Sequence, residues 1–338
     1  MQFETARQGP LRVRASSSSR PAVKTPPPTK KVVVALGGNA LLERKEEPSA
    51  ENQARHARQA AEAIGRLVRG EGWALCVTHG NGPQIGLLAL QMPEAGLDVL
   101  GAESEGQIGY LLESELGDEL GGDQVVSLLT QTTVSPDDPA FKDPSKFIGP
   151  TYSKDEAERN AREKGWTVKA DGKKGYRRVV ASPAPLQVLE ARAIQVLLDA
   201  GFVTVCAGGG GVPVAVEEVA GGRVLRRRHG IEAVIDKDAA SALLAAEVGA
   251  EALLLLTDAP AVFDPRKWPD KQAPVPSPIS PEALLELGDF SAGSMGPKVQ
   301  AACKFVRDTG GIAGIGALGD ALDILRGTRG TLIKRSQP

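Results

Sequence analysis

The chain has 338 residues, of which 41% are hydrophobic and 24% are charged, and its formal net charge is −2. These values are typical of a globular protein with a full hydrophobic core, and the length predicts about two domains or lobes. The charge argues against nucleic-acid binding, because nucleic-acid binders present a broad basic field. No apolar run approaches the roughly 20 residues of a membrane-spanning helix.

The three cysteines, Cys76, Cys206 and Cys303, are far apart in the sequence and lie in apolar segments. They match neither a disulfide framework nor the spacing of a metal site, so we expect reduced residues in the core. The one dense basic run, residues 226–229, follows a Gly-Gly turn, and we interpret it as the solvated edge of a hairpin.

Residues 1–30 differ from the rest of the chain, because they are rich in Arg, Lys, Ser and Pro and show no apolar periodicity. This composition predicts a disordered tail and matches an organellar transit peptide. The letters VRAS at residues 13–16 resemble a plastid cleavage site. We therefore expect an organellar protein, with the plastid favoured over the mitochondrion. The alternative is a tail without targeting function on a cytoplasmic protein.

From residue 31 onward, strand patterns alternate with helix patterns. This alternation predicts an α/β fold, a three-layer αβα sandwich around a mainly parallel central sheet. We place an N-terminal lobe at 31–235 and a C-terminal lobe at 236–338. Strands are expected at 32–36, 73–78, 202–206 and 252–257, and helices at about 51–69, from Pro83, at about 186–200 and from a cap at Asp236.

The alternation fails between about residues 131 and 178, where Pro, Lys and Asp are frequent. A structureless loop of this length is unusual in a compact domain, so we expect a small protruding subdomain. Its position in the chain suggests a lid over the site.

Glycine turns follow three of the apolar strands: Gly37-Gly38, Gly80-Asn81-Gly82 and residues 208–211. Because the carboxyl ends of parallel strands meet at one edge of a sheet, these turns should line a trough of backbone N–H groups. Such a trough suits phosphate. The alternative for any single turn is a tight turn without a ligand.

Most phosphate-binding fingerprints are absent. The chain has no P-loop and no protein-kinase signature. A G-x-G-x-x-G pattern at Gly314, Gly316 and Gly319 has too little chain after it for a dinucleotide-binding unit. We interpret these glycines as packing residues around a last strand and helix.

Two lysines stand at the starts of expected helices. Lys237 is flanked by Asp236 and Asp238, and Lys298 follows Pro297, which suits the first helical position. A lysine in the first turn opposes the helix dipole, and a bound anion would remove that conflict. The alternative is that both are ordinary surface lysines.

Nine segments occur in the order found in carbamate kinases, a family with the amino-acid-kinase fold. The chain resembles that family from about Lys31 to Ile333, and the segments GSMGPKV and DPAFKDPSKFIG are fairly specific to it. The segments are VVALGGNAL, THGNGPQIG, GQIGY, DPAFKDPSKFIGPTY, RRVVASPAP, GGGGVPV, IEAVIDKDAAS, LLTDA and GSMGPKV.

One position separates carbamate kinases from their cousins. Acetylglutamate, uridylate and aspartate kinases carry a lysine two residues before the glycine pair, in K-x-G-G, whereas this chain has Ala35 there. In carbamate kinases a lysine of the protruding subdomain helps to fill that role, and the matching residue is Lys146.

The resemblance implies reversible phosphoryl transfer between ATP and carbamate, giving ADP and carbamoyl phosphate, in a homodimer that uses ATP/ADP and Mg²⁺. Lys146, Lys237 and Lys298 would surround the phosphates, and Asp236 would orient a lysine or help to hold Mg²⁺ through water. No protein metal ligand is expected otherwise, because the nucleotide phosphates bind Mg²⁺. Carbamate and the transferred group would contact Gly37, Gly38, Asn39, Gly80, Asn81 and Gly82, and the nucleotide would contact Thr257, Asp258, Ala259, Val262, Phe263, Gly293, Met295 and Lys298.

Several points stay open in the sequence. Phe263 fits a core aromatic as well as a nucleotide contact, and His79 is expected to order its turn rather than to move a proton. Glu103 and Glu105 stand where relatives often carry neutral residues, and they would weaken anion binding if they faced the site. The competing functions are another kinase of this fold, acting on a small acid or phosphate, and a nucleotide-binding regulator without catalysis.

Overall fold

The computed structural model describes residues 30–38, 49–172, 175–219, 225–267, 273–290 and 295–336. The expected transit peptide and two expected site residues, Asn39 and Gly293, lie outside the described residues. The described part contains no helix that is long and apolar enough to cross a membrane.

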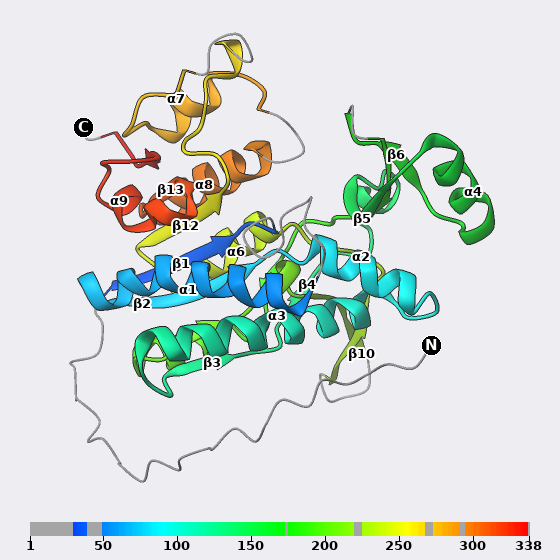
Figure 1. Cartoon of the computed structure of the whole chain (residues 1–338), viewed down its shortest axis with the longest axis horizontal. Helices are drawn as coiled ribbons and strands as arrows, with labels where there is room; N and C mark the ends of the chain where they lie inside the picture. The colour runs from blue at the N-terminus through cyan, green and yellow to red at the C-terminus, as the bar shows by residue number, and fades with distance from the viewer. Residues whose placement is uncertain are drawn as a thin grey trace.

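Helices and strands alternate along most of the chain (Figure 1). The helices are α1 (Ala50–Glu71), α2 (Gly82–Gln91), α3 (Leu97–Leu120), α4 (Lys154–Lys164), α5 (Ala191–Asp199), α6 (Lys237–Glu247), α7 (Pro281–Leu285), α8 (Met295–Thr309) and α9 (Ala321–Leu325). The strands are β1 (Lys30–Leu36), β2 (Trp73–His79), β3 (Val125–Ser127), β4 (Gln131–Thr133), β5 (Lys146–Tyr152), β6 (Val168–Ala170), β7 (Tyr176–Val180), β8 (Gln187–Val188), β9 (Val203–Val205), β10 (Val212–Val219), β11 (Leu225–Gly230), β12 (Ala252–Thr257), β13 (Ile312–Ala317) and β14 (Thr331–Ile333).

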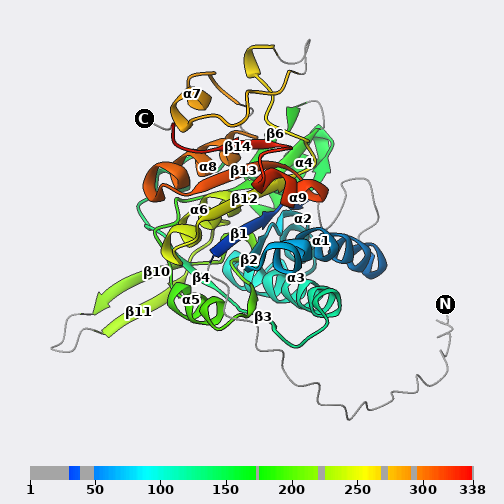
Figure 2. The same ribbon diagram turned by 90° about the vertical axis from the view of Figure 1, so that its left-hand side faces the viewer.

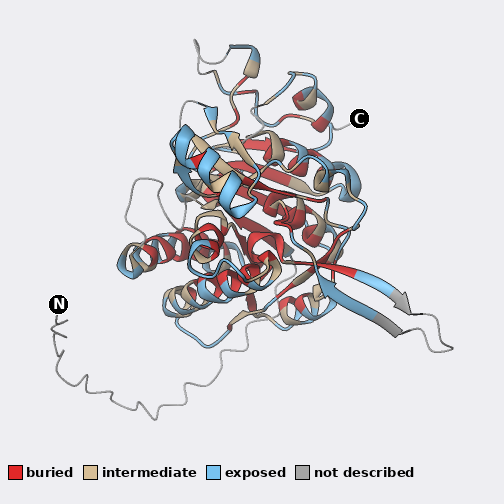
Figure 3. Cartoon of the chain, turned by 90° about the vertical axis from the view of Figure 1, so that its right-hand side faces the viewer, coloured by how far each residue is buried: buried red, intermediate tan, exposed pale blue. Residues whose placement is uncertain are grey.

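The central sheet has the strand order β14-β13-β12-β1-β2-β9-β3. All neighbouring strands in it are parallel except β13 and β14, which are antiparallel. The mainly parallel sheet confirms the expected fold class. Parallel strands of this kind are buried on both faces, and Figure 3 shows them as the buried centre of the molecule.

Strand β1 shows how the two faces are built. Val33 and Ala35 belong to the apolar cluster that also contains residues of α5, α6 and α8. Val32, Val34 and Leu36 belong to the cluster on the opposite face, with residues of α1, α3 and α9. Because side chains alternate along a strand, an uninterrupted apolar strand needs a helical layer on each side. The result is the expected three-layer αβα sandwich.

A second sheet, with the order β11-β10-β4-β8, carries a hairpin of β10 and β11 that projects from the body (Figure 2). Its cross-strand register places Glu217 opposite Arg227. Arg227, Arg228 and His229 are exposed, so the basic run forms a solvated hairpin edge as expected.

The third sheet, with the order β5-β7-β6, forms with α4 a protrusion at one side of the molecule (Figure 1), which we call the lid. The lid spans residues 146–180. The segment expected to protrude, about 131–178, therefore divides, because β4 pairs with β10 and β8 in the second sheet. The proposed division into lobes at residue 235 stays a prediction.

The helix expected at about 186–200 is wrong in its first third, up to residue 190. Residues 187–188 form β8, which pairs with β4, and α5 begins only at Ala191. Two hydrogen bonds to distant residues hold this irregular segment: the carboxylate of Glu247 accepts one from Val188 N, and the carboxylate of Glu190, in the segment itself, accepts one from Gln131 N. The hydrophobic periodicity of a segment carries no information about hydrogen-bond partners that are distant in the sequence.

The G-x-G-x-x-G pattern is confirmed as a packing feature for its first two glycines. A Cβ on Gly314 would overlap Ile324 of α9, and a Cβ on Gly316 would lie 2.8 Å from another atom of the same side chain. These glycines therefore allow α9 to approach β13.

Candidate active site

The first two glycine turns meet at the carboxyl ends of β1 and β2. Gly80 N donates a hydrogen bond to Leu36 O at 3.1 Å, and Gly37 N donates one to Leu256 O at 3.2 Å. A Cβ on Gly80 would lie 3.1 Å from Gly38 N and 3.6 Å from Lys237 Cδ. Bare backbone from two strands thus lies against a lysine. These two N–H groups are used within the fold, so the expected trough of N–H groups for an anion stays a prediction.

The third glycine turn packs against the second. Gly209, Gly210 and Gly211 have φ values of 63°, 94° and 83°, a conformation that favours glycine. A Cβ on Gly209 would overlap the side chain of Asn81, so glycine is needed there for space as well. Asn81 Nδ2 in turn donates a hydrogen bond to Ser104 Oγ of α3 at 2.8 Å. The three turns therefore pack against one another, but residues 208–211 are buried, so the first two turns provide the partly exposed surface.

The lid contributes a cation to this surface. Lys146, the first residue of β5, places its Nζ 2.6 Å from Asp236 Oδ2. The other oxygen of Asp236 accepts hydrogen bonds from Asp238 N and Ala239 N and so caps α6, as the sequence predicted. Burial of Asp236 acts to raise the pKa of its carboxyl, but the positive charge of Lys146 opposes this, and the pKa is lowered overall. Asp236 therefore joins the lid to the start of α6.

Asp238 holds the other two lysines. Its carboxylate lies 2.5 Å from Lys237 Nζ and 3.0 Å from Lys298 Nζ, and all three side chains are buried. Burial opposes the charge on Asp238, but the two ammonium groups lower the pKa of its carboxyl well below the ordinary value. Burial lowers the pKa of the Lys237 ammonium, and Asp238 opposes that shift.

Asp238 was not among the expected site residues. The sequence places it next to Lys237, but nothing in its spacing indicates that Lys298, 60 residues later, shares its carboxylate. The only available signal was the Asp-Lys-Asp triplet at a helix start. The structure brings Lys146, Lys237 and Lys298 together with two aspartates, which leaves net positive charge for an anion.

Glu105 lies beneath the third glycine turn and is 2% exposed. Its Oε1 accepts a hydrogen bond from Gly208 N at 2.9 Å, and its Oε2 accepts one from Thr130 N at 3.2 Å. Burial raises the pKa of the carboxyl to about 8, although both hydrogen bonds oppose the shift. Glu105 thus supports the turn from the side of α3, which the sequence did not indicate; Glu103 is exposed.

His79 lies against the third glycine turn, where a Cβ on Gly208 would overlap its ring. Its Nδ1 lies 3.3 Å from Gly80 O, while its Nε2 is buried without a hydrogen-bond partner among the described residues. Burial lowers the pKa of the imidazole to about 4, so the ring is neutral at physiological pH. The hydrogen bond to the Gly80 carbonyl fits the expected role in ordering the turn.

The expected nucleotide contacts lie around the end of β12. Asp258 is exposed, and Thr257, Ala259, Phe263 and Met295 are half-buried. Val262 is fully buried in the core cluster that α8 shares, so its side chain supports this region from within. Phe263 is half-buried, a position that fits a core aromatic as well as a nucleotide contact.

Helix α8 begins at Met295, so Pro297 is its third residue rather than its first. Lys298 still lies in the first turn, as expected. Among the described residues, no group of three or more His, Cys, Asp or Glu side chains could hold a metal ion. The site's carboxylates are paired with lysines, so a metal here would need ligands from a bound nucleotide.

The three buried or half-buried lysines, the glycine turns and the lid agree with the resemblance noted in the sequence. The model of the amino acid kinase family matches residues 30–315. A carbamate kinase of Rhizobium meliloti (strain 1021) is 50% identical over 311 residues, which cover 89% of this chain and 92% of the relative. The chain belongs to the carbamate kinases of the amino acid kinase family.

Solved structures of carbamate kinases share the fold. A carbamate kinase from Giardia lamblia bound to citric acid aligns with a TM-score of 0.83 and 36% identity, covering 91% of this chain and 99% of that chain. The Giardia lamblia enzyme bound to AMP-PNP aligns with a TM-score of 0.79 and 37% identity, with the same coverage. The family membership makes this protein a kinase.

Proposed function

We propose that the protein transfers a phosphoryl group reversibly between ATP and carbamate, forming ADP and carbamoyl phosphate. The observation that carries this proposal is the position of Lys146. The lid lysine pairs with Asp236, the residue before Lys237, whereas the K-x-G-G position used by other kinases of the fold is Ala35. The site therefore obtains its third cation in the way that distinguishes carbamate kinases.

The chemistry follows from charge. A carbamate oxygen attacks the γ-phosphorus while the bond to the bridging oxygen of ADP breaks, so no proton has to move. Negative charge is spread over the transferred group and the leaving oxygen, and catalysis consists mainly of positioning and electrostatic stabilisation. Lys146, Lys237 and Lys298 supply that stabilisation, and the first two glycine turns, which carry no Cβ, let the anions approach the backbone beside Lys237.

The nucleotide would lie at the end of β12, with its phosphates toward Lys298. Mg²⁺ would neutralise charge on those phosphates, which also provide most of its ligands. Asp236 is the residue best placed to receive a water molecule of the ion, since its side chain is 25% exposed. The high free energy of an acyl phosphate makes the reaction able to run toward ATP.

The decisive experiment supplies the purified chain with Mg-ADP and carbamoyl phosphate and follows ATP with a coupled assay. ATP formation that Lys298→Ala abolishes is the expected result. If folded protein binds ADP but forms no ATP, the proposal is wrong, and another acid substrate or a regulatory role takes its place. Parallel reactions with acetylglutamate and UMP as acceptors for ATP separate those alternatives.

We also propose that the protein is a homodimer. Apolar side chains are exposed on α3, where Val99 is 49% and Tyr110 67% exposed, and burial in an interface would remove them from water. Sedimentation should give about twice the chain mass of 35.3 kDa. A species of one chain mass across the micromolar range would reject the dimer.

Finally, we propose that residues 1–30 direct the protein to an organelle, with the plastid favoured. Their Arg-, Ser- and Pro-rich composition supports this proposal. Fusion of these residues to a fluorescent protein tests it, and diffuse cytoplasmic fluorescence would reject it.

A further inference from the structure

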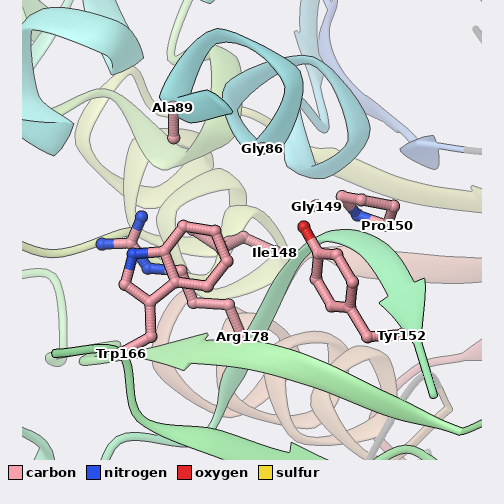
Figure 4. A pocket seen from close by; sticks show the side chains of 8 residues that line it. All are labelled: Gly86, Ala89, Ile148, Gly149, Pro150, Tyr152, Trp166 and Arg178. Carbon is pink, nitrogen blue, oxygen red and sulfur yellow. The ribbon is translucent and has the colours of Figure 1, made fainter. Parts of the chain in front are cut away.

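The lid meets the body at a contact between two glycine backbones. Gly86 is a buried residue of α2, and Gly149 lies in the middle of β5. A Cβ on Gly86 would overlap both the Cα and the N of Gly149, so no side chain fits between the two segments. Figure 4 shows both glycines at this junction.

The contact is asymmetric. A Cβ on Gly149 would lie 3.5 Å from Gly86 Cα, which is an ordinary van der Waals distance. Gly149 has instead a φ of 69°, so an alanine there would strain the backbone of β5 without pressing on α2. The two glycines are therefore needed for different reasons: space at Gly86 and conformation at Gly149.

Neighbouring residues fix β5 in this position. Ile148 is 1% exposed and packs with Ile85 of α2 and with Leu97 and Leu100 of α3. Arg177 of β7 donates a hydrogen bond from Nε to Gly149 O at 3.1 Å. The lid is thus held at its base by apolar packing on one side and by its own sheet on the other.

The same two elements reach the site. Helix α2 begins at Gly82, directly after the Gly80 turn, and β5 begins at Lys146, three residues before Gly149. At a strand rise of about 3.3 Å per residue, Lys146 is about 10 Å from the contact. A shift of β5 away from α2 would therefore be transmitted to Lys146 with little loss.

We propose that the Gly86–Gly149 contact is a positioning device that sets the distance of Lys146 from the anion-binding turns. This inference rests on the proposed function in one respect, namely that Lys146 is a catalytic residue. A Cβ on Gly86 would meet only backbone atoms of Gly149 and Ile148, so Gly86 acts through β5. Its effect on activity must then depend on the presence of the Lys146 side chain.

The experiment is a double-mutant cycle. Gly86→Ala should lower kcat by roughly tenfold or more, because small misplacements of a catalytic group are costly. In a Lys146→Ala background the same substitution should leave kcat unchanged within about twofold. Gly101→Ala is the matched control, since Gly101 is a buried helical glycine at which a Cβ meets nothing within 4 Å, and it should leave kcat unchanged in both backgrounds.

A measurement that does not depend on catalysis distinguishes failure of this inference from failure of the proposed function. Hydrogen exchange of the β5 amides should accelerate in Gly86→Ala and not in Gly101→Ala, because β5 loses its support on α2. If the wild-type chain forms no ATP while Gly86→Ala still accelerates this exchange, the proposed function fails and the mechanical contact stands. Unchanged exchange, or an equal loss of kcat in both backgrounds, overturns the inference.

Gly149→Ala provides a second variant should Gly86→Ala not fold. It strains β5 from the lid side while leaving α2 intact, and it should reproduce the kcat loss only where Lys146 is present. A kcat loss that persists in the Lys146→Ala background would also overturn the inference.

Discussion

Lys146 of the lid and Asp236 at the cap of α6 form an ion pair of 2.6 Å, although 90 residues separate them in the chain. The pair links the lid, the protrusion at one side of Figure 1, to the helix that carries Lys237. Because the two side chains are 29% and 25% exposed, a substrate anion can still compete for the lysine. The paired carboxylate compensates the ammonium group for the water it has lost, so the lysine can stay charged at this position.

Replacement of Lys146 by alanine should reduce turnover more than nucleotide binding. Loss of one stabilising donor in a transition state typically lowers kcat by about a hundredfold or more, whereas ATP contacts other elements. Kinetics and titration calorimetry on the same protein measure both effects. An equal loss of kcat and ATP affinity would contradict the role of the lid lysine.

Asp238→Asn should destabilise the protein and abolish activity. The substitution keeps the shape but leaves Lys237 and Lys298 buried without their shared anion, which typically costs about 3–5 kcal/mol. Urea denaturation measures the loss. The control is Asp308→Asn, which breaks an exposed pair with Lys304 and should change stability by less than about 1 kcal/mol.

The contribution of Asp238 to the free energy of unfolding should also depend on pH. Its carboxyl has a lowered pKa in the folded protein, so its stabilising contribution is present above the pKa of the unfolded chain, near 3.9. That contribution is lost as the pH falls through the folded pKa. The stability gap between wild type and Asp238→Asn should therefore be full at pH 7 and narrow only in strong acid.

Glu105→Gln should stabilise the protein more at pH 9 than at pH 5. Burial raises the pKa of Glu105 to about 8, so ionisation destabilises the folded state as pH rises from about 4.3, the unfolded value, through 8. Glutamine resembles the protonated acid and avoids this loss. His79, Glu190 and Cys206 also interact with this corner, but the difference between the two proteins isolates the Glu105 carboxyl.

Thermal unfolding across this pH range tests the prediction, and Glu103→Gln on the exposed face of α3 is the control. A difference in Tm between Glu105→Gln and wild type that stays constant with pH would contradict a titrating group beneath the Gly208 turn.

Gly209→Ala should impair anion binding beyond its effect on the fold. Both Gly209 and Gly249 have a positive φ, of 63° and 67°, so alanine strains either backbone by about 1–2 kcal/mol. A Cβ on Gly209 would also overlap Asn81, whereas a Cβ on Gly249 meets nothing within 4 Å. We expect a raised KM for carbamoyl phosphate in Gly209→Ala alone. Similar KM values in both variants would separate this turn from the site.

Elements whose cause is local could be predicted from the residues next to them in the chain. The apolar run at β1 required helices on both faces, the Asp236 side chain had the position and chemistry of a helix cap, and glycine after a strand left the backbone without side-chain cover. Patterns of this kind act between neighbours along the chain, so they can be read without the fold. The family motifs added the pairing of Lys146 with the site, which no local pattern contains.

Contacts between residues far apart in the chain could not be predicted in this way, because they depend on how the elements pack. Asp238 receives Lys298 because α6 and α8 lie side by side, and Glu105 meets Gly208 because α3 passes beneath the turn. Gly86 faces Gly149 because β5 folds back onto α2. Each of these contacts depends on the packing of whole elements, and a single side chain or a missing Cβ carries no sequence signal of its distant partner.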